Sequence, residues 1–193
     1  VKVETEAGLE MEFDHLVLAT QANSAIRMLK QPTPIETDAL DSFTYESVEI
    51  VLHRDPSFMP PRQKDWAEFN MVYDAAFESA MCTVWMNRFY EDAKLKQPLF
   101  QTIMPISEPK PESKICERRL QRPVVNQKSI RGLELIREIH AQPQRRIWFC
   151  GSYASAGVPL LESGVVSAQS VATKIDQRRK IDVEKREHPS GIS

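Results

Sequence analysis

One stretch of this sequence, residues 145–175, constrains the fold more than any other. It opens with the apolar run Ile147–Cys150, which is typical of a buried strand, and Gly151 ends that run. A loop of small residues follows, and from about Ser163 the pattern predicts a helix. A strand, a loop and a helix in this order place a helix N-terminus beside backbone that a ligand can approach closely. We expect one stripe of this helix to be formed by Val165, Ala168, Ala172 and Ile175.

The composition excludes two classes of protein. The chain has 193 residues, enough for a sizeable core in one or two domains, and its net charge is −2. A nucleic-acid-binding protein would need a basic excess to neutralise phosphates. No apolar run approaches the roughly 20 residues that a membrane span needs, and the first residues lack the apolar segment of a signal peptide. We therefore expect a cytoplasmic (intracellular) protein with no nucleic acid partner and no membrane span.

Neither the cysteines nor the histidines cluster as metal ligands do, so we expect no metal site. The cysteines are odd in number and far apart, and each lies in or near an apolar, strand-like run. This placement favours three buried, reduced thiols. The residues concerned are Cys82, Cys116 and Cys150, and His15, His53, His140 and His188.

The first forty residues alternate between strand and helix signals. Residues 1–5 and 9–13 flank a turn-like break and predict a β-hairpin. The apolar run Leu16–Ala19 predicts an inner strand of a covered, often parallel, sheet. The polar loop that follows it lies at the usual ligand edge of an α/β sheet. Two helices are then expected, at residues 24–29 and 35–42, the second with Thr37 or Asp38 near its start.

From Phe43 onward the pattern changes to strands. Residues 45–54 alternate, with Val48, Ile50 and Leu52 on one face, and the prolines that follow mark a rigid loop. Residues 43–125 therefore predict an antiparallel sheet inserted between two pieces of an α/β layer. Further strands are expected at 66–73, 81–89 and 100–104, with weaker ones at 115–120 and 123–125, and a helix at 133–140.

Several motifs have a structural interpretation that outweighs the functional one. Cys116 and Arg122 have the spacing of a phosphatase loop, but a glutamate and bulky residues fill the interval that should cradle phosphate. The sequence His53-Arg54-Asp55 lacks the downstream Asn of a kinase catalytic loop. An aromatic set favours plain core over an apolar substrate cavity. This set is Trp66, Phe69, Trp85 and Phe89. For the serines at helical spacing, Ser163, Ser167 and Ser170, a solvated or packing role is favoured over a role as polar ligands.

Two segments resemble the family of flavin-containing amine oxidoreductases. Asp14–Thr20 is similar to the Asp-x-apolar-Val-apolar-Ala-Thr strand that runs past the FAD in flavoproteins with two dinucleotide-binding domains. Trp148–Gly151, followed by Gly157–Gly164, is similar to the C-terminal FAD motif of the family. The resemblance extends from the first hairpin to about Ala172. Shorter pieces between these segments are similar to a branch often described as NAD/FAD-binding or amine oxidase: Met59–Arg62, Trp66, Trp85–Arg88 and Arg122–Val124.

The resemblance implies an FAD cofactor and hydride transfer from a C–N or C–H bond to the flavin. It assigns no catalytic residue. It implies that Gly151 and Ser152 contact the diphosphate or ribityl chain, and that Ala19 and Thr20 lie near the adenosine side or the central diphosphate. The isoalloxazine would lie beside residues 159–162. The full cofactor-binding set is Ala19, Thr20, Gly151, Ser152, Gly157, Pro159, Leu160, Leu161 and Glu162.

This sequence departs from the family pattern in three ways. Ser152 stands where many relatives carry an acidic residue, and Pro159-Leu160-Leu161 replaces a Gly-rich approach to the last helix. The Gly-x-Gly-x-x-Gly of the N-terminal βαβ unit is absent from this sequence. We therefore expect FAD not to be retained by this chain alone, and expect a missing N-terminal dinucleotide-binding segment or partner chain to complete the site.

Together these patterns predict an α/β (α+β) fold. A partial FAD-binding, Rossmann-like layer lacks its N-terminal βαβ unit and carries an inserted antiparallel substrate-side sheet. The expected activity is that of the C-terminal part of an FAD-dependent oxidoreductase acting on an apolar or amine small molecule. The alternative is a non-catalytic binding or scaffold module that retains part of the flavoprotein fold. The predicted boundaries are 1–42 and 126–180 for the FAD-binding part, 43–125 for the inserted sheet and 181–193 for a charged tail.

Overall fold

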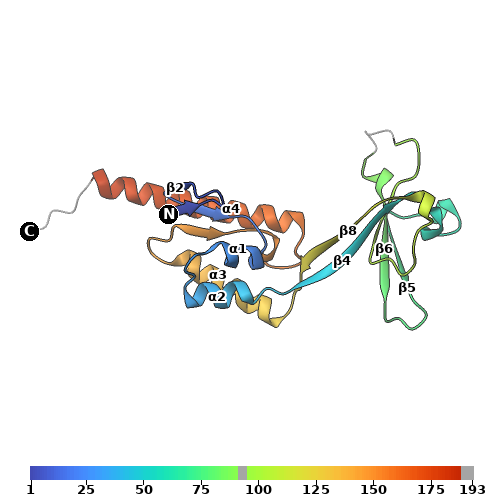
Figure 1. Cartoon of the computed structure of the whole chain (residues 1–193), viewed down its shortest axis with the longest axis horizontal. Coiled ribbons are helices and arrows are strands. Elements are labelled where there is room, and N and C mark those ends of the chain that lie inside the picture. Colours follow the sequence, from blue (N-terminus) through green and yellow to red (C-terminus); the bar gives the residue numbers. More distant parts are fainter. Residues whose placement is uncertain (91–94, 188–193) are drawn as a thin grey trace, which may run out of the picture. The chain divides into compact units, whose positions relative to one another are not determined.

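The computed structural model describes residues 1–90 and 95–187, with side chains described as far as Ile181. The described residues form a mixed α/β fold with four α-helices, one parallel sheet and otherwise antiparallel sheets (Figure 1). The chain divides into two compact units, one made of Val1–Tyr45 with Pro123–Ser193 and the other of Glu46–Arg122. Among the described helices, none combines the length and the apolar composition that crossing a membrane requires.

The first unit contains a short antiparallel hairpin, a parallel strand pair and all four α-helices. The hairpin confirms the prediction made for residues 1–13, with Val3 opposite Met11. The elements are β1 (Lys2–Glu4), β2 (Glu10–Glu12), β3 (Leu16–Leu18), α1 (Ala22–Met28), α2 (Pro34–Asp41), α3 (Gln127–Ala141), β9 (Ile147–Phe149), the 3₁₀ turn η6 (Ser152–Ala154) and α4 (Leu161–Glu187). Of the predicted charged tail, residues 181–187 belong to α4, and residues 188–193 lie outside the described residues.

In the parallel pair of β3 and β9, strand β9 packs against helices on both of its faces. Leu18 and Phe149 are buried in a core shared with α1, α2 and α3. Trp148 and Cys150 point to the other side, where they pack with Val171 of α4. Alternate residues of a strand point to opposite faces, so each face of β9 serves one core. The parallel pairing expected for the Leu16–Ala19 run is therefore present, but Val17 is 42% exposed, so the strand is not covered on both faces.

Helices α2 and α3 lie side by side, as Figure 1 shows. Helix α2 begins with a capping box, in which the Thr33 hydroxyl accepts from the Glu36 N–H and the Glu36 carboxylate accepts from the Thr33 N–H. The helix predicted at 35–42 is therefore present within one residue of its expected bounds, but Thr33, and not Thr37 or Asp38, marks its start. Close packing with α3 requires a glycine, because a Cβ on Gly132 would lie only 2.7 Å from the Cβ of Ser42.

The packed face of α4 differs from the predicted stripe. Val165 is 49% exposed, and Ala168 and Ala172 are exposed as well, so that part of the prediction is wrong. The face that contacts the rest of the unit carries Ser167 and Val171, which are 5% and 3% exposed. Ile175, the last member of the predicted stripe, does pack against the Trp148 cluster.

The second unit is built on a five-stranded sheet with the strand order β5-β6-β7-β4-β8. One face carries Val51, His53, Thr83, Phe100 and Thr102, all fully buried. Nε2 of His53 lies 2.8 Å from the Thr102 hydroxyl, and that hydroxyl lies 2.8 Å from the Thr83 hydroxyl. The strands are β4 (Tyr45–His53), β5 (Phe69–Tyr73), β6 (Ala80–Trp85), β7 (Phe100–Ile103) and β8 (Lys114–Pro123).

Four predictions that involve this unit need correction. The strand expected at 81–89 ends at Trp85, and a 3₁₀ turn, Met86–Arg88, follows it. The weak strand expected at 115–120 extends to ten residues in β8 (Lys114–Pro123), and the separate strand expected at 123–125 is absent, since residues 124–125 lie outside β8. The aromatic set is not all core, because Phe69 and Phe89 are 60% and 52% exposed. Of the cysteines, only Cys150 is buried, whereas Cys82 is partly exposed and Cys116 is exposed.

Candidate functional site

The parallel pairing brings two strand ends to the same edge of the sheet. The N–H of Cys150 donates to the carbonyl of Leu18 at 3.2 Å, which aligns the residues that leave β3 with those that leave β9. Thr20 and Gly151 consequently approach each other, and a Cβ on Gly151 would lie 3.4 Å from the Thr20 carbonyl oxygen. Two segments about 130 residues apart in the sequence thus form one edge, at the carboxyl ends of parallel strands.

Gly151 is required at this edge for conformational and steric reasons. Its φ is +145°, a backbone conformation that residues with a Cβ rarely adopt. A Cβ would also come within 3.1 Å of the Tyr153 ring. The glycine therefore permits a sharp change of direction from β9 into η6 and leaves the backbone open to close approach.

Ser167 of α4 fixes the backbone of Gly151. Its hydroxyl oxygen accepts from the Gly151 N–H at 2.9 Å and lies 2.9 Å from the Gly151 carbonyl oxygen and 3.0 Å from that of Gly164. Ser167 is 5% exposed, so these hydrogen bonds are shielded from water. The packing role expected for this serine is thus borne out, and its partner is the candidate site itself.

Several backbone N–H groups at this edge have no partner in the described part of the chain. They include the N–H of Ser152 at the start of η6 and those of Leu161 and Glu162 in the first turn of α4. Ser163 fixes that turn, because its hydroxyl donates to the Val158 carbonyl at 2.7 Å. Gly164 faces Ser152, where a Cβ would lie 3.7 Å from the Ser152 nitrogen. Unpaired N–H groups and a helix N-terminus favour a negatively charged or oxygen-rich ligand group.

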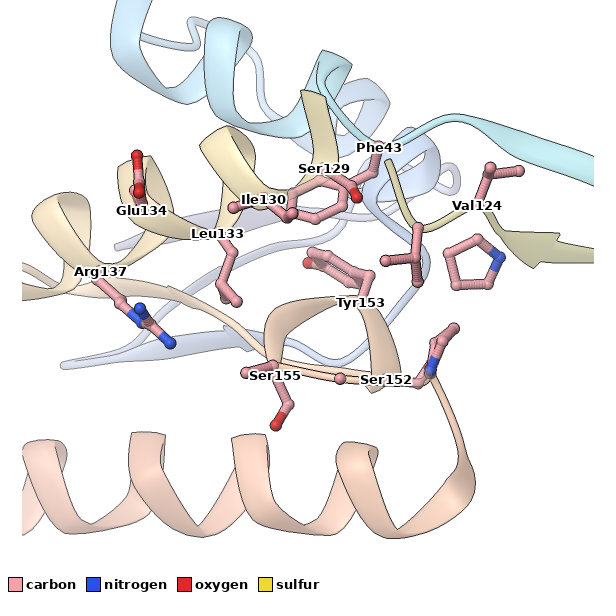
Figure 2. A pocket seen from close by; sticks show the side chains of 15 residues that line it. Phe43, Val124, Ser129, Ile130, Leu133, Glu134, Arg137, Ser152, Tyr153 and Ser155 are labelled. Atoms are coloured by element: carbon pink, nitrogen blue, oxygen red, sulfur yellow. The ribbon is translucent and has the colours of Figure 1, made fainter. Parts of the chain in front are cut away.

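A hollow of about 190 Å³ adjoins this edge, between α3 and the segment that follows η6. Ser152, Gly157 and Pro159 line it together with mostly apolar side chains, among them Val124 and Leu133. Figure 2 shows Tyr153 and Leu133 projecting into the same space from opposite sides.

Tyr153 is the largest side chain of the loop and is 6% exposed. Its ring packs edge-on against Phe43, with ring centroids 4.8 Å apart. Within the described residues its hydroxyl makes no hydrogen bond. Burial raises the pKa of this phenol, with smaller contributions from Tyr45 and Cys150, so it stays protonated at neutral pH. A buried hydroxyl without a partner is a group that a ligand oxygen or nitrogen would satisfy.

The nine predicted site residues fall into three groups. Ala19, Thr20 and Gly151 lie at the strand edge, and Ser152, Gly157 and Pro159 line the hollow beside it. The remaining three are exposed: Leu160 directly precedes α4, and Leu161, which is 93% exposed, and Glu162 are its first two residues. Sequence reasoning missed Tyr153, although it is the only large residue between Gly151 and Gly157.

The second unit presents an open apolar face on its sheet. Residues directly opposite each other on paired strands share a face, and Met71 is opposite Cys82, which is opposite Ile103. Phe69 and Met71 on this face are 60% and 55% exposed. Phe69 also contacts Phe89, with ring centroids 5.6 Å apart. The face is suited to an apolar molecule.

The described residues contain no group of three or more His, Cys, Asp and Glu side chains placed to hold a metal ion. A scan against protein-family models finds no match to this sequence. A search of curated proteins finds no match either.

Proposed function

We propose that this chain supplies part of the FAD site of an oxidoreductase similar to the flavin-containing amine oxidoreductases. The observation that carries the proposal is the meeting of Thr20, Gly151 and the start of α4 at one edge. In this proposal Gly151 and Ser152 hold the diphosphate or ribityl chain, because their backbone is open to close approach and the Ser152 N–H has no partner in the described residues.

The residues at this edge fit the polar parts of such a cofactor. The N–H groups of Leu161 and Glu162 stand at a helix N-terminus, where negative charge is favoured. Residues 159–162 would lie beside the isoalloxazine, and Ala19 and Thr20 near the adenosine side or the central diphosphate. The flavin, when bound, would supply the acceptor for a hydride from a C–N or C–H bond. The chain's own contribution is binding and orientation, and no residue is assigned as catalytic.

The partner that the proposal requires is a dinucleotide-binding segment, either from the same polypeptide or from a partner chain. The requirement for such a segment is supported by the parallel sheet, which has only two strands in the described residues. Parallel sheets are normally covered and wider than this. The exposed Val17 on β3 offers apolar surface for such a segment. The substrate in this proposal is an apolar or amine small molecule, which the open face around Phe69 and Met71 supports.

The test is the flavin content of the native gene product that carries this sequence, measured by its visible absorption after purification. The matched variant is Gly164→Ala. The added methyl makes only ordinary contacts, 3.7 Å from the Ser152 nitrogen and 4.0 Å from the Gly151 carbonyl carbon. We expect the variant to fold and to lose about tenfold or more in FAD affinity, because the methyl covers a site-facing N–H. A native product that never contains flavin would overturn the proposal.

The alternative function is a non-catalytic binding or scaffold module that keeps part of a flavoprotein fold. Ser152 in place of an acid favours it. The two functions separate on turnover: a flavoprotein enzyme bleaches its flavin on adding an apolar amine under anaerobic conditions, whereas a scaffold does not.

A further inference from the structure

We infer that a second cavity of the first unit, enclosed by α3, η6 and α4, binds the oxyanion of a small molecule, a phosphate or a carboxylate. The cavity has a volume of about 220 Å³. Arg137 from α3 and Lys174 from α4 line it, and among the described residues no Asp or Glu does. None of the nine predicted cofactor residues lines it either, so the inference goes beyond the proposed function.

The two cations lack counterions. Within the described residues, neither Arg137 nor Lys174 makes an ion pair or a side-chain hydrogen bond. Other cations of the same unit are paired: Arg131 contacts Glu134 at 3.1 Å and Arg145 contacts Glu36 at 2.6 Å. Glu134, which lies three residues before Arg137 on α3, is thus already engaged.

Like charges face each other across the cavity. Lys174 is half-buried, and its pKa is lowered by burial and then by the neighbouring Arg137 and Arg178. Arg178 lies one turn further along α4, over the ring of Trp148 at 5.8 Å. Bringing cations together in a partly dehydrated space costs free energy, and a bound anion would remove that cost.

The other polar groups in the cavity can donate hydrogen bonds. Nε2 of His140 accepts from the Phe149 N–H at 3.1 Å, so the ring proton of the neutral imidazole is on Nδ1. The hydroxyls of Ser155 and Ser170 make no hydrogen bond within the described residues, whereas that of Ser167 is occupied by Gly151. An oxyanion accepts several such bonds at once, and its charge makes each of them stronger than a bond to a neutral acceptor.

The floor of the cavity is apolar and firmly packed. Ile136, Phe149 and Val171 are at most 3% exposed and line the cavity together with the charged side chains. Charge-assisted hydrogen bonds above such a floor are stronger than those in water. Figure 2 shows the Arg137 side chain extending from α3 toward the side on which Ser155 lies, and both residues line this cavity. A ligand with an oxyanion and a small apolar part fits this arrangement.

The experiment is a calorimetric titration of the full chain with inorganic phosphate and, separately, with acetate, at constant ionic strength. We expect one saturable site for at least one of the two anions, and the tighter probe identifies the oxyanion. Arg137→Gln and Lys174→Gln should each raise the Kd about tenfold, because each removes a charge-assisted contact. Circular dichroism checks that both variants fold, since both side chains project from helix surfaces.

The matched control is Arg131→Gln, which removes the same charge from the same helix at a residue outside the cavity. It should leave the Kd within about twofold of the parent value, because salt screens the attraction between the anion and an exposed charge outside the cavity. A loss of affinity as large as that of Arg137→Gln, or no saturable binding of either anion, would mean that the cations form only a solvated surface. Displacement of the anion by FAD would assign the cavity to the flavin site and would also overturn the inference of a separate site.

Discussion

The hydroxyl oxygen of Ser167 lies 2.9 Å from both the amide nitrogen and the carbonyl oxygen of Gly151. This contact joins α4 to the turn at the end of β9, and it is almost entirely buried. A glycine with a φ of +145° has wide conformational freedom when unfolded, so it needs an external contact to hold one direction. Ser167 provides that contact and thereby fixes where the Ser152 N–H points.

Replacement of Ser167 by alanine should destabilise the chain by about 1–3 kcal/mol, because the buried Gly151 N–H loses its acceptor. Urea-induced unfolding followed by circular dichroism measures the change. Ser170→Ala is the control, since that hydroxyl makes no hydrogen bond in the described residues, and it should change stability by no more than about 0.5 kcal/mol. Equal effects of the two substitutions would show that the Gly151 contact contributes nothing measurable.

Gly132→Ala should destabilise the packing of α2 against α3. The new Cβ would lie 2.7 Å from the Cβ of Ser42 and 2.9 Å from the Ala39 carbonyl oxygen, so the two helices would have to separate. We expect a loss of about 1–3 kcal/mol from overpacking, measured by urea denaturation. Gly164→Ala, which meets only ordinary contacts, should instead be neutral or stabilising by up to about 1 kcal/mol through helix propensity. A neutral Gly132→Ala would contradict the close helix crossing.

The sequence pattern was sufficient to predict those elements whose conformation is indicated by their own apolar residues. The runs at Leu16 and Ile147 indicate strands because the apolar residues are contiguous, and both form strands that pair in parallel. The same pattern did not reveal that Val17 is exposed, because coverage of a strand depends on elements remote in the sequence. Likewise, half of the residues of β8 are charged, and its pairing with β4 stabilises the full length of the strand.

The face of α4 shows most clearly why the site was only partly predictable. Periodicity favoured Val165 and Ala168, which are apolar, but the hydrogen bond from Ser167 to Gly151 and the packing of Val171 on Trp148 set the face. A polar residue that is buried by a specific hydrogen bond leaves no periodic signal. Tyr153 differs, because a single large residue in a loop of small ones is a visible signal for a packed anchor.

Stability should fall in acid through the buried pair of Glu36 and Arg145. Burial raises the pKa of Glu36, but hydrogen bonds from the Thr33 N–H and hydroxyl and the contact with Arg145 outweigh it, so the pKa lies below its usual value. A carboxyl with a depressed pKa contributes stability that is present above the unfolded pKa and lost as pH falls through the folded one.

Glu36→Gln should therefore cost about 3–5 kcal/mol at pH 7, because it leaves the guanidinium of Arg145 buried without its counterion. Below about pH 4.5, the stability of the variant should also decrease less steeply than that of the parent. The control is Glu134→Gln, which breaks the exposed pair with Arg131 and should cost no more than about 1 kcal/mol. Urea unfolding at pH 7 and pH 4 measures both effects, and similar losses for the two variants would refute a special role for Glu36.

His140 should make stability depend on pH between about pH 4 and pH 6.5. Burial lowers its pKa to about 4, with smaller contributions from Lys174 and Arg145, whereas the unfolded value is near 6.5. In this interval the unfolded chain binds more protons than the folded chain, so stability falls as pH decreases from 6.5 to 4. Protonation of Nε2 would also remove the acceptor that the Phe149 N–H uses at 3.1 Å.

The full interval corresponds to about 3 kcal/mol, since one pKa unit is worth about 1.4 kcal/mol. His140→Gln removes the titrating group and keeps an acceptor, so the variant should be less stable than the parent at pH 7 but should lose much less stability between pH 7 and pH 5. The difference between the two slopes isolates His140 from His53, whose pKa is also lowered by burial. Identical slopes for parent and variant would show that His140 titrates normally in the folded chain.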